Sequence, residues 1–211
     1  MNRWLESRWQ RCFRLSGGSS VGKVAVITGV PGSGKTTVLR EVVKVLESIG
    51  VRYQVVNYGD VMFRIMSERL GVKHRDEMRK IETGVYREIQ REAGREIASM
   101  ARTSNVIVDT HCLVKKPEGY YPGLPVWVLE ELKPDVLIIV EADPSEIAGR
   151  RQRDADRARD MDLIEEIAEH QQMNRSVATA YAALTGAAVK IVQNREGRLN
   201  EAVEKIVEVL R

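Results

Sequence analysis

Val24-Ala25-Val26-Ile27-Thr28 runs without a break into Gly29-Val30-Pro31-Gly32-Ser33-Gly34-Lys35-Thr36-Thr37, and a segment of helical periodicity follows. The second stretch satisfies the pattern G-x-x-x-x-G-K-[ST] between an apolar strand and a helix, which is the context that separates a phosphate-binding loop from a chance match. Glycines let such a loop turn its N–H groups around a phosphate, and the helix dipole adds to the attraction. We therefore predict that residues 29–37 bind the phosphates of a nucleoside triphosphate.

Individual residues at the end of this loop have expected roles. Lys35 should reach the β- and γ-phosphates, and the Thr36 hydroxyl should bind Mg²⁺. Asp109 ends a later apolar run, where proteins with this loop hold Mg²⁺, often through water; the alternative is an aspartate that caps the next segment. Because ligands of open α/β sheets gather at the carboxyl ends of the strands, Asn57 and Glu141 are expected near the same cleft.

The rest of the chain alternates short apolar runs with longer segments of helical periodicity. The runs are continuous, as in strands that helices cover on both faces, so the pattern predicts a doubly wound α/β domain with a parallel sheet. The expected strands are residues 24–28, 53–57, 106–109, 136–141 and 189–193. The expected helices are residues 35–49, 61–70, 83–102, 125–132, 144–153, 163–184 and 199–210.

Composition favours a globular domain and limits its partners. The 211 residues are 43% hydrophobic and 30% charged, with a net charge of only +3, so we expect no nucleic-acid partner. No apolar run is long enough to cross a bilayer, so we expect no membrane partner. Cys12 and Cys112 have no disulfide or metal-ligand pattern, which favours a cytoplasmic protein.

The first 22 residues are interpreted as an N-terminal extension, flexible and joined through a Ser- and Gly-rich linker to a single domain at 23–211. Arg3, Arg8, Arg11 and Arg14 interrupt each apolar run, so the segment lacks the apolar core of a signal peptide. An alternative is a helix that lies on a membrane surface or docks on a partner.

The loop predicts nucleotide binding but leaves the reaction open. A GTPase-like switch would carry N-K-x-D, and D-x-x-G after the magnesium aspartate, but Asp109 is followed by Thr110-His111-Cys112. An ATPase that drives conformational change would usually be larger. A nucleic-acid-modifying factor is poorly supported by the near-neutral charge. A small-molecule phosphotransferase is therefore favoured.

Two basic clusters support the phosphotransferase. One spans residues 74–80, and the other, residues 149–160, carries five arginines within ten residues. The simplest alternative is a solvent-exposed surface on which the basic residues pair with neighbouring acidic residues. A kinase that joins two phosphorylated nucleotides, however, must neutralise several negative charges in a dry cleft, which guanidinium groups do well. The second cluster would also suit a lid that excludes water.

Several further strings narrow the interpretation. They are Val26-Ile27-Thr28-Gly29-Val30-Pro31-Gly32, Val56-Asn57-Tyr58-Gly59-Asp60-Val61-Met62, Arg75-Asp76-Glu77-Met78-Arg79-Lys80, Asn105-Val106-Ile107-Val108-Asp109-Thr110-His111, Gly123-Leu124-Pro125-Val126-Trp127-Val128-Leu129-Glu130-Glu131-Leu132, Glu169-His170-Gln171 and Met173-Asn174-Arg175. Together they resemble the archaeal adenylate kinases over nearly all of residues 23–211.

The resemblance implies a P-loop NTPase fold: a five-stranded parallel sheet flanked by helices, with an AMP-binding helical region at about 60–102 and a short lid at about 150–160. It implies that Mg·ATP and AMP react reversibly to give two ADP, and that the protein forms a homotrimer. Adenine as the acceptor base comes from the resemblance alone, so a uridylate or cytidylate kinase is the alternative.

On this interpretation Asp60 and Arg79 belong to the AMP site, with Arg79 on the acceptor phosphate. The groups that act on the transferred phosphoryl are Lys35, Arg150, Arg157 and Arg159. Bacterial-type relatives carry Asp-Gly-Phe-Pro-Arg after the third strand, whereas here Asp109 is followed by Thr110-His111. A second ligand for the AMP phosphate is therefore unassigned, and His111 is left between a substrate contact and a structural role.

Overall fold

A five-stranded parallel sheet in the order β2-β3-β1-β6-β7 forms the centre of the fold. The computed structural model describes residues 22–116, 118–153 and 164–211. The strands are β1 Val24–Thr28, β2 Tyr53–Asn57, β3 Asn105–Asp109, β6 Val136–Glu141 and β7 Ala188–Gln193. All five predicted strands are confirmed; β3 and β7 each begin one residue earlier than predicted.

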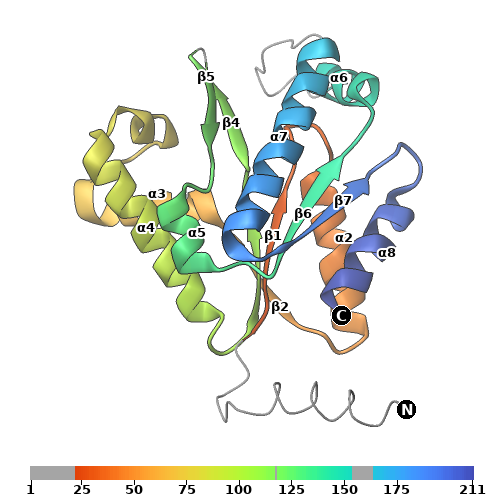
Figure 1. Ribbon diagram of the computed structural model, residues 1–211, viewed down its shortest axis with the longest axis horizontal. Coiled ribbons are helices and arrows are strands. Elements are labelled where there is room, and N and C mark those ends of the chain that lie inside the picture. The colour runs from red at the N-terminus through yellow and green to blue at the C-terminus, as the bar shows by residue number, and fades with distance from the viewer. Residues whose placement is uncertain (1–21, 117, 154–163) are drawn as a thin grey trace, which may run out of the picture.

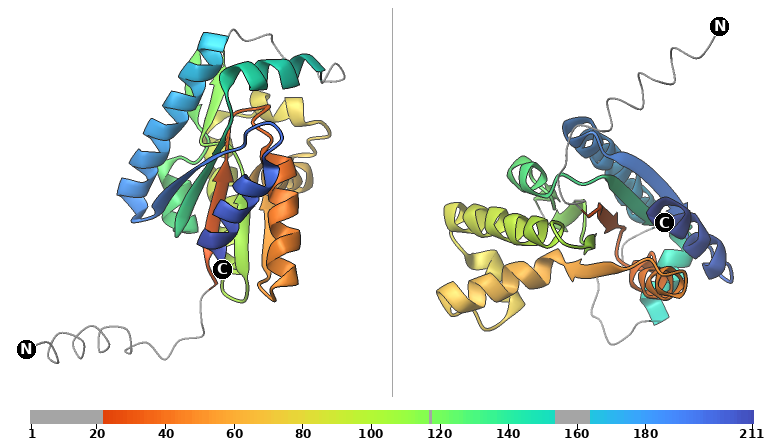
Figure 2. Two further views of the ribbon diagram at one scale, coloured as in Figure 1. Left: turned by 90° about the vertical axis from the view of Figure 1, so that its right-hand side faces the viewer. Right: turned by 90° about the horizontal axis from the view of Figure 1, so that it is seen from below.

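Helices cover both faces of the sheet, and the helix α6 lies at its carboxyl edge (Figures 1 and 2). On one face α2 packs beside α8, and the other face carries α3, α4, α5 and α7. Their bounds are α2 Lys35–Ser48, α3 Tyr58–Leu70, η1 Arg75–Lys80, α4 Thr83–Met100, α5 Val126–Leu132, α6 Pro144–Arg153, α7 Ile164–Thr185 and α8 Leu199–Leu210. No helix among the described residues has the length and apolarity needed to cross a membrane.

Strand β1 shows why the predicted strands are continuous apolar runs. Val24 and Val26 point into the core shared with α3, α4, α5 and α7, whereas Ala25 and Ile27 point into the core shared with α2 and α8. All four are at most 5% exposed. Because successive side chains alternate between faces, burial on both sides demands an apolar residue at every position.

Helices α3 and α4 begin at side-chain caps. Asn57 accepts a hydrogen bond from the Asp60 N–H at 3.1 Å, so α3 begins at Tyr58, three residues before the predicted start. Glu82 accepts from the N–H groups of Gly84 and Val85 at 2.8 and 3.0 Å at the start of α4. These bonds favour the carboxylate and lower the pKa of Glu82.

An antiparallel hairpin, β4 Leu113–Lys116 and β5 Gly119–Pro122, follows β3 and was absent from the predicted elements. It rises beside the N-terminal half of α7 (Figure 1). The Tyr181 hydroxyl of α7 donates to the Cys112 carbonyl at 3.0 Å at the hairpin base, and the Tyr120 ring lies 5.0 Å from that of His170. The hairpin is therefore held by α7.

Of the predicted N-terminal extension, only Gly22 lies within the described residues. The predicted lid at 150–160 is described only as far as Arg153, which ends α6. Arg157 and Arg159 lie outside the described residues.

Candidate functional site

The phosphate loop connects β1 to α2 at the carboxyl edge of the sheet. Gly34, the N-cap of α2, has a left-handed backbone with φ 84°, and no side chain caps the helix. The first-turn N–H groups are thus available to an anion. Gly29 passes so close to β6 that an added Cβ would lie 2.5 Å from the Val140 carbonyl oxygen. Glycine at both positions follows from the backbone geometry.

Lys35 and Asp109, two predicted site residues, form an ion pair in the structure. The Lys35 Nζ also donates to the Thr110 carbonyl at 3.1 Å, and the Asn57 Nδ2 donates to Asp109 Oδ2 at 3.2 Å. The side chains of Lys35 and Asp109 are only 10% and 16% exposed, so their attraction is weakly screened. The ends of β1, β2 and β3 therefore meet at one charged centre, as the sequence predicted for Asn57 and Asp109.

Side chains from later in the chain bind the carbonyl groups of the loop. Arg150 donates to the Ser33 carbonyl at 3.4 Å and to the Asn194 carbonyl at 3.2 Å, and pairs with Glu146 at 2.9 Å. Arg151 donates to the Pro31 carbonyl from Nε at 2.9 Å and from Nη2 at 2.8 Å. Of these two arginines only Arg150 is among the predicted site residues.

Asn194 was also not among the predicted site residues. It follows β7, is 7% exposed, and donates from Nδ2 to the Ser33 carbonyl at 2.8 Å. A single asparagine after a strand has no periodicity or spacing that would indicate a contact 161 residues away.

His111 lies 3.1 Å through Nδ1 from the Gly29 carbonyl oxygen. Because a carbonyl only accepts, this contact requires the proton on Nδ1. The bond ties the segment after β3 to the start of the phosphate loop, which is a structural role for the ring. The buried Thr28 hydroxyl makes a similar tie, since it accepts from the Cys112 N–H at 2.8 Å.

The oxygen ligands at the loop fit a magnesium ion that arrives with a nucleotide. Thr36 is exposed in the first turn of α2, and the Asp109 carboxylate contacts the neighbouring Lys35. Within the described ranges, no group of three or more His, Cys, Asp or Glu residues gathers around a common point. Mg²⁺ characteristically takes one or two protein oxygens, with substrate phosphates and water completing its shell.

The predicted AMP-site residues lie around η1. Asp60, in the first turn of α3, forms an ion pair with Arg75 at the start of η1, and both side chains are more than half exposed. Arg79 lies within η1, and its side chain is outside the described part of the structure. The Asp60–Arg75 pair therefore brings η1 to the start of α3.

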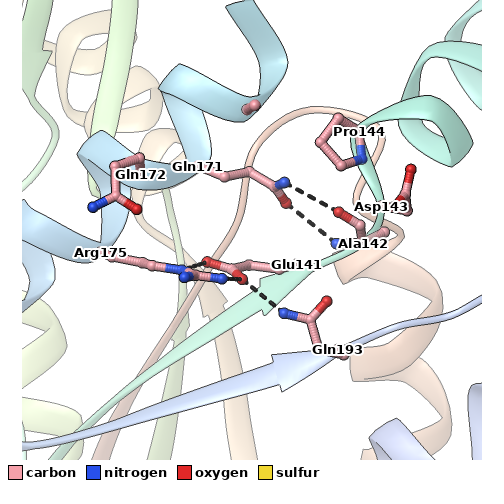
Figure 3. Close-up of a pocket in the computed structure, with 9 residues that line it drawn as sticks. Glu141, Ala142, Asp143, Pro144, Gln171, Gln172, Arg175 and Gln193 are labelled. Atoms are coloured by element: carbon pink, nitrogen blue, oxygen red, sulfur yellow. Dashed lines mark hydrogen bonds and ion pairs between the residues drawn. The ribbon is translucent and has the colours of Figure 1, made fainter. Parts of the chain in front are cut away.

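A polar pocket of about 280 Å³ opens where β6 and β7 end against α6 and α7 (Figure 3). Glu141, with its side chain 2% exposed, accepts from Arg175 at 2.7 and 2.5 Å and from Gln193 at 2.8 Å. Gln171 bonds both the N–H and the carbonyl of Ala142, at 3.2 and 3.1 Å. Since these polar groups satisfy one another, Glu141 serves to attach α7 to the sheet.

Comparisons with known proteins agree with this geometry. A family model described as the AAA domain matches residues 28–168. An adenylate kinase from Methanopyrus kandleri is 57% identical over 193 residues, covering 90% of this chain and 99% of the relative. Another, from Methanothermobacter thermautotrophicus, is 51% identical, covering 89% of this chain and 99% of the relative. The chain belongs to the adenylate kinase family.

Membership of the adenylate kinase family confirms the resemblance found in the sequence strings. A solved structure, a shikimate kinase from Bacteroides thetaiotaomicron, superposes with a TM-score of 0.52 at 15% identity, covering 89% of this chain and 98% of that one. This likeness confirms the predicted fold, a parallel sheet between helices with the phosphate loop after β1. The match covers nearly the whole length of both adenylate kinase relatives and about 90% of this chain, so the hairpin and α7 lie inside the matched region.

Proposed function

We propose that the protein is an adenylate kinase, which transfers the γ-phosphoryl group of Mg·ATP reversibly to AMP and gives two ADP. The observation that carries the proposal is the match to adenylate kinases at 57% and 51% identity over nearly their whole length. The phosphate loop, with its Lys35–Asp109 pair at the carboxyl edge of the sheet, supplies the donor site that the reaction requires.

On the donor side, residues 29–37 bind the triphosphate through backbone N–H groups. When ATP enters, Lys35 exchanges its bond to Asp109 for the β- and γ-phosphates. Thr36 and Asp109 would hold Mg²⁺, Asp109 through water, and the bound ion would supply charge neutralisation at the phosphates. Because the site is partly buried, these charged contacts act in a medium less polar than water, where they are stronger.

On the acceptor side, residues of about 60–102 bind AMP. Arg79 is proposed to bind the acceptor phosphate, and Asp60 to contribute to the site through its pair with Arg75. A phosphate oxygen is already ionised at neutral pH, so the transfer needs no general base. The protein's task is to align the acceptor oxygen with the γ-phosphorus and to bind both charges.

The segment of about 150–160 is proposed as a lid that excludes water, the competing acceptor. Arg150, Arg157 and Arg159 would bind the charge that develops during transfer. Arg150 contacts the Ser33 and Asn194 carbonyls through one guanidinium group, so it stands beside the phosphate loop. Arginines in this role accelerate phosphoryl transfer by roughly 10³–10⁵-fold in other enzymes. We further propose a cytoplasmic homotrimer with no nucleic-acid or membrane partner.

The test is an acceptor panel. The purified protein is incubated with Mg·ATP and AMP, GMP, CMP, UMP or no acceptor, and the nucleotide products are quantified with and without EDTA. We expect rapid, Mg-dependent ADP formation when AMP is the acceptor, and little with the other monophosphates or without an acceptor. A preference for CMP or UMP would show that the acceptor is not AMP. ATP hydrolysis at the same rate with every acceptor and with none would refute the proposal that the protein is a kinase.

A further inference from the structure

Two carbonyl groups of the phosphate loop are bound from outside the loop by side chains that follow β6 and β7. Arg151 of α6 binds the Pro31 carbonyl, and Asn194 binds the Ser33 carbonyl at 2.8 Å. Each contact joins residues at least 120 positions apart. The orientation of these loop peptides thus depends on residues that are far away in the sequence.

The Asn194 contact acts on the peptide group that carries the Gly34 N–H. In a planar trans peptide the carbonyl and the N–H point in opposite directions. When Asn194 holds the Ser33 carbonyl on its own side, the Gly34 N–H must point away from Asn194. Gly34 has φ 84°, and glycine tolerates several peptide orientations at little cost. An external restraint is therefore what selects one of them.

Asn194 is itself fixed in place. Its N–H donates to the Glu141 carbonyl at 2.7 Å, one residue beyond the paired end of β7, and its carbonyl accepts from Arg150 at 3.2 Å. Its Nδ2 packs so closely on Gly34 that an added Cβ there would clash with it. Because Asn194 is 7% exposed, bulk water would not replace its lost bond to the Ser33 carbonyl, which would keep only the longer of the two bonds described above, from Arg150 at 3.4 Å.

We propose that Asn194 is a positioning residue for the nucleoside triphosphate: its side-chain amide orients the Ser33–Gly34 peptide so that the Gly34 N–H donates to a phosphate oxygen. The inference rests on the proposed function only in taking Mg·ATP as the ligand of the loop. AMP binds elsewhere, so Asn194 should affect the donor and not the acceptor.

The experiment compares Asn194→Ala, Asn194→Asp and the control Gln193→Ala. Gln193 is the preceding residue, and its amide binds Glu141 instead of the loop. Each variant keeps the backbone bond to Glu141, and aspartate also keeps the shape of asparagine. Calorimetry measures the affinities for Mg·ATP and, separately, for AMP. We expect about fivefold weaker Mg·ATP binding in Asn194→Ala and a larger loss in Asn194→Asp, whose carboxylate faces a carbonyl and repels phosphate. AMP affinity should not change.

Amide NMR gives a second readout, which a general loss of stability would not reproduce. The Gly34 N–H resonance should move downfield when Mg·ATP binds the wild type or Gln193→Ala, and much less in the two Asn194 variants. Wild-type Mg·ATP affinity in both variants, or equal losses for Mg·ATP and AMP, would overturn the proposal. If the wild type binds Mg·ATP but does not phosphorylate AMP, the proposed function fails and the Asn194 comparison still decides this inference.

Discussion

The phosphate loop, on the proposed donor side, and helices α3 and α4 with η1, on the proposed acceptor side, differ in the polar contacts that fix them. The phosphate loop is fixed by hydrogen bonds to its own carbonyl groups from Asn194, Arg150 and Arg151. In the proposed AMP-binding region, exposed ion pairs link α3 to η1 and α4, although the buried Tyr58 hydroxyl of α3 also donates to the Gln90 carbonyl of α4 at 2.9 Å. Bonds to backbone fix the direction of a peptide, whereas an exposed ion pair contributes at most about 1 kcal/mol.

This difference suits a reaction that joins two nucleotides. A phosphate loop needs its N–H groups aligned before the triphosphate arrives, because reorganising them would weaken electrostatic stabilisation of the transfer. The acceptor side can adjust when AMP enters, since α3 and α4 bury their apolar faces while η1 stays largely at the surface. We therefore expect the loss of Lys35 to cost far more activity than the loss of any of these surface ion pairs.

The largest effect is expected for Lys35→Ala. Removing the ammonium group withdraws a charged donor from the phosphates and leaves the Asp109 carboxylate uncompensated. We expect kcat/KM for ATP to fall at least about 10³-fold, measured with AMP saturating. Lys44→Ala is the control, because Lys44 lies on the exposed face of the same helix and pairs with Glu41 there. Substantial activity in Lys35→Ala would contradict the donor-site assignment.

Sequence alone predicts those features of the fold and of the candidate site that are specified by residues close together in the chain. The phosphate loop and the β1 strand were predicted because each is specified within a few residues, by glycine spacing or by burial on both faces. Asp109 was singled out because it ends an apolar run, where proteins with this loop hold Mg²⁺, and Asn57 because ligands gather at the carboxyl ends of parallel strands. Each of these rules needs no knowledge of which distant residue is the neighbour.

The missed features depend on distant neighbours. Strand β4 carries Lys115 and Lys116 on exposed positions, and its place is set by α7 through contacts such as Tyr181 to Cys112. Asn194 and Arg151 are polar residues whose role appears only once the fold brings them to loop carbonyls. Neither case has an apolar period, so the sequence pattern contains no signal for it.

The reactivity of the Cys112 thiol reports whether solvent and reagents reach the region beside the phosphate loop. Cys112 is fully buried beside Thr28 at the end of β1, and burial raises the pKa of its thiol from 9.0 to about 11. At pH 8 the thiolate fraction is then lower by about a hundredfold than for an ordinary thiol. We expect iodoacetamide to modify Cys112 in the folded protein at least that much more slowly than in urea, as measured by peptide mapping. Fast modification would mean that this region opens locally.

The same group gives a pH dependence of definite sign. Because its folded-state pKa of about 11 lies above the unfolded value near 9, the thiol favours the folded state fully below pH 9. That contribution is lost as the pH rises towards about 11. A stability measurement from pH 8 to pH 11 should therefore fall more steeply for the wild type than for Cys112→Ala. Equal slopes would show that the thiol is not desolvated.

Arg79→Ala probes the acceptor side. If Arg79 binds the AMP phosphate, its loss removes charge-assisted hydrogen bonds, and KM for AMP should rise by about 30-fold. KM for ATP should change little, which separates the two sides within one variant. Arg40→Ala is the matched control, since Arg40 lies exposed on α2 and pairs with Glu41 at 3.1 Å. An unchanged KM for AMP would remove Arg79 from the site.

The smallest effect is expected for the ion pair of Arg69 and Glu92 between α3 and α4, whose side chains are 51% and 46% exposed. A double-mutant cycle with Arg69→Ala and Glu92→Ala should give a coupling free energy below about 1 kcal/mol that shrinks as salt is added. The measurement is urea unfolding at low and high ionic strength. A salt-insensitive coupling above about 2 kcal/mol would show that the acceptor side is held as firmly as the phosphate loop, and the contrast between the two sides would not stand.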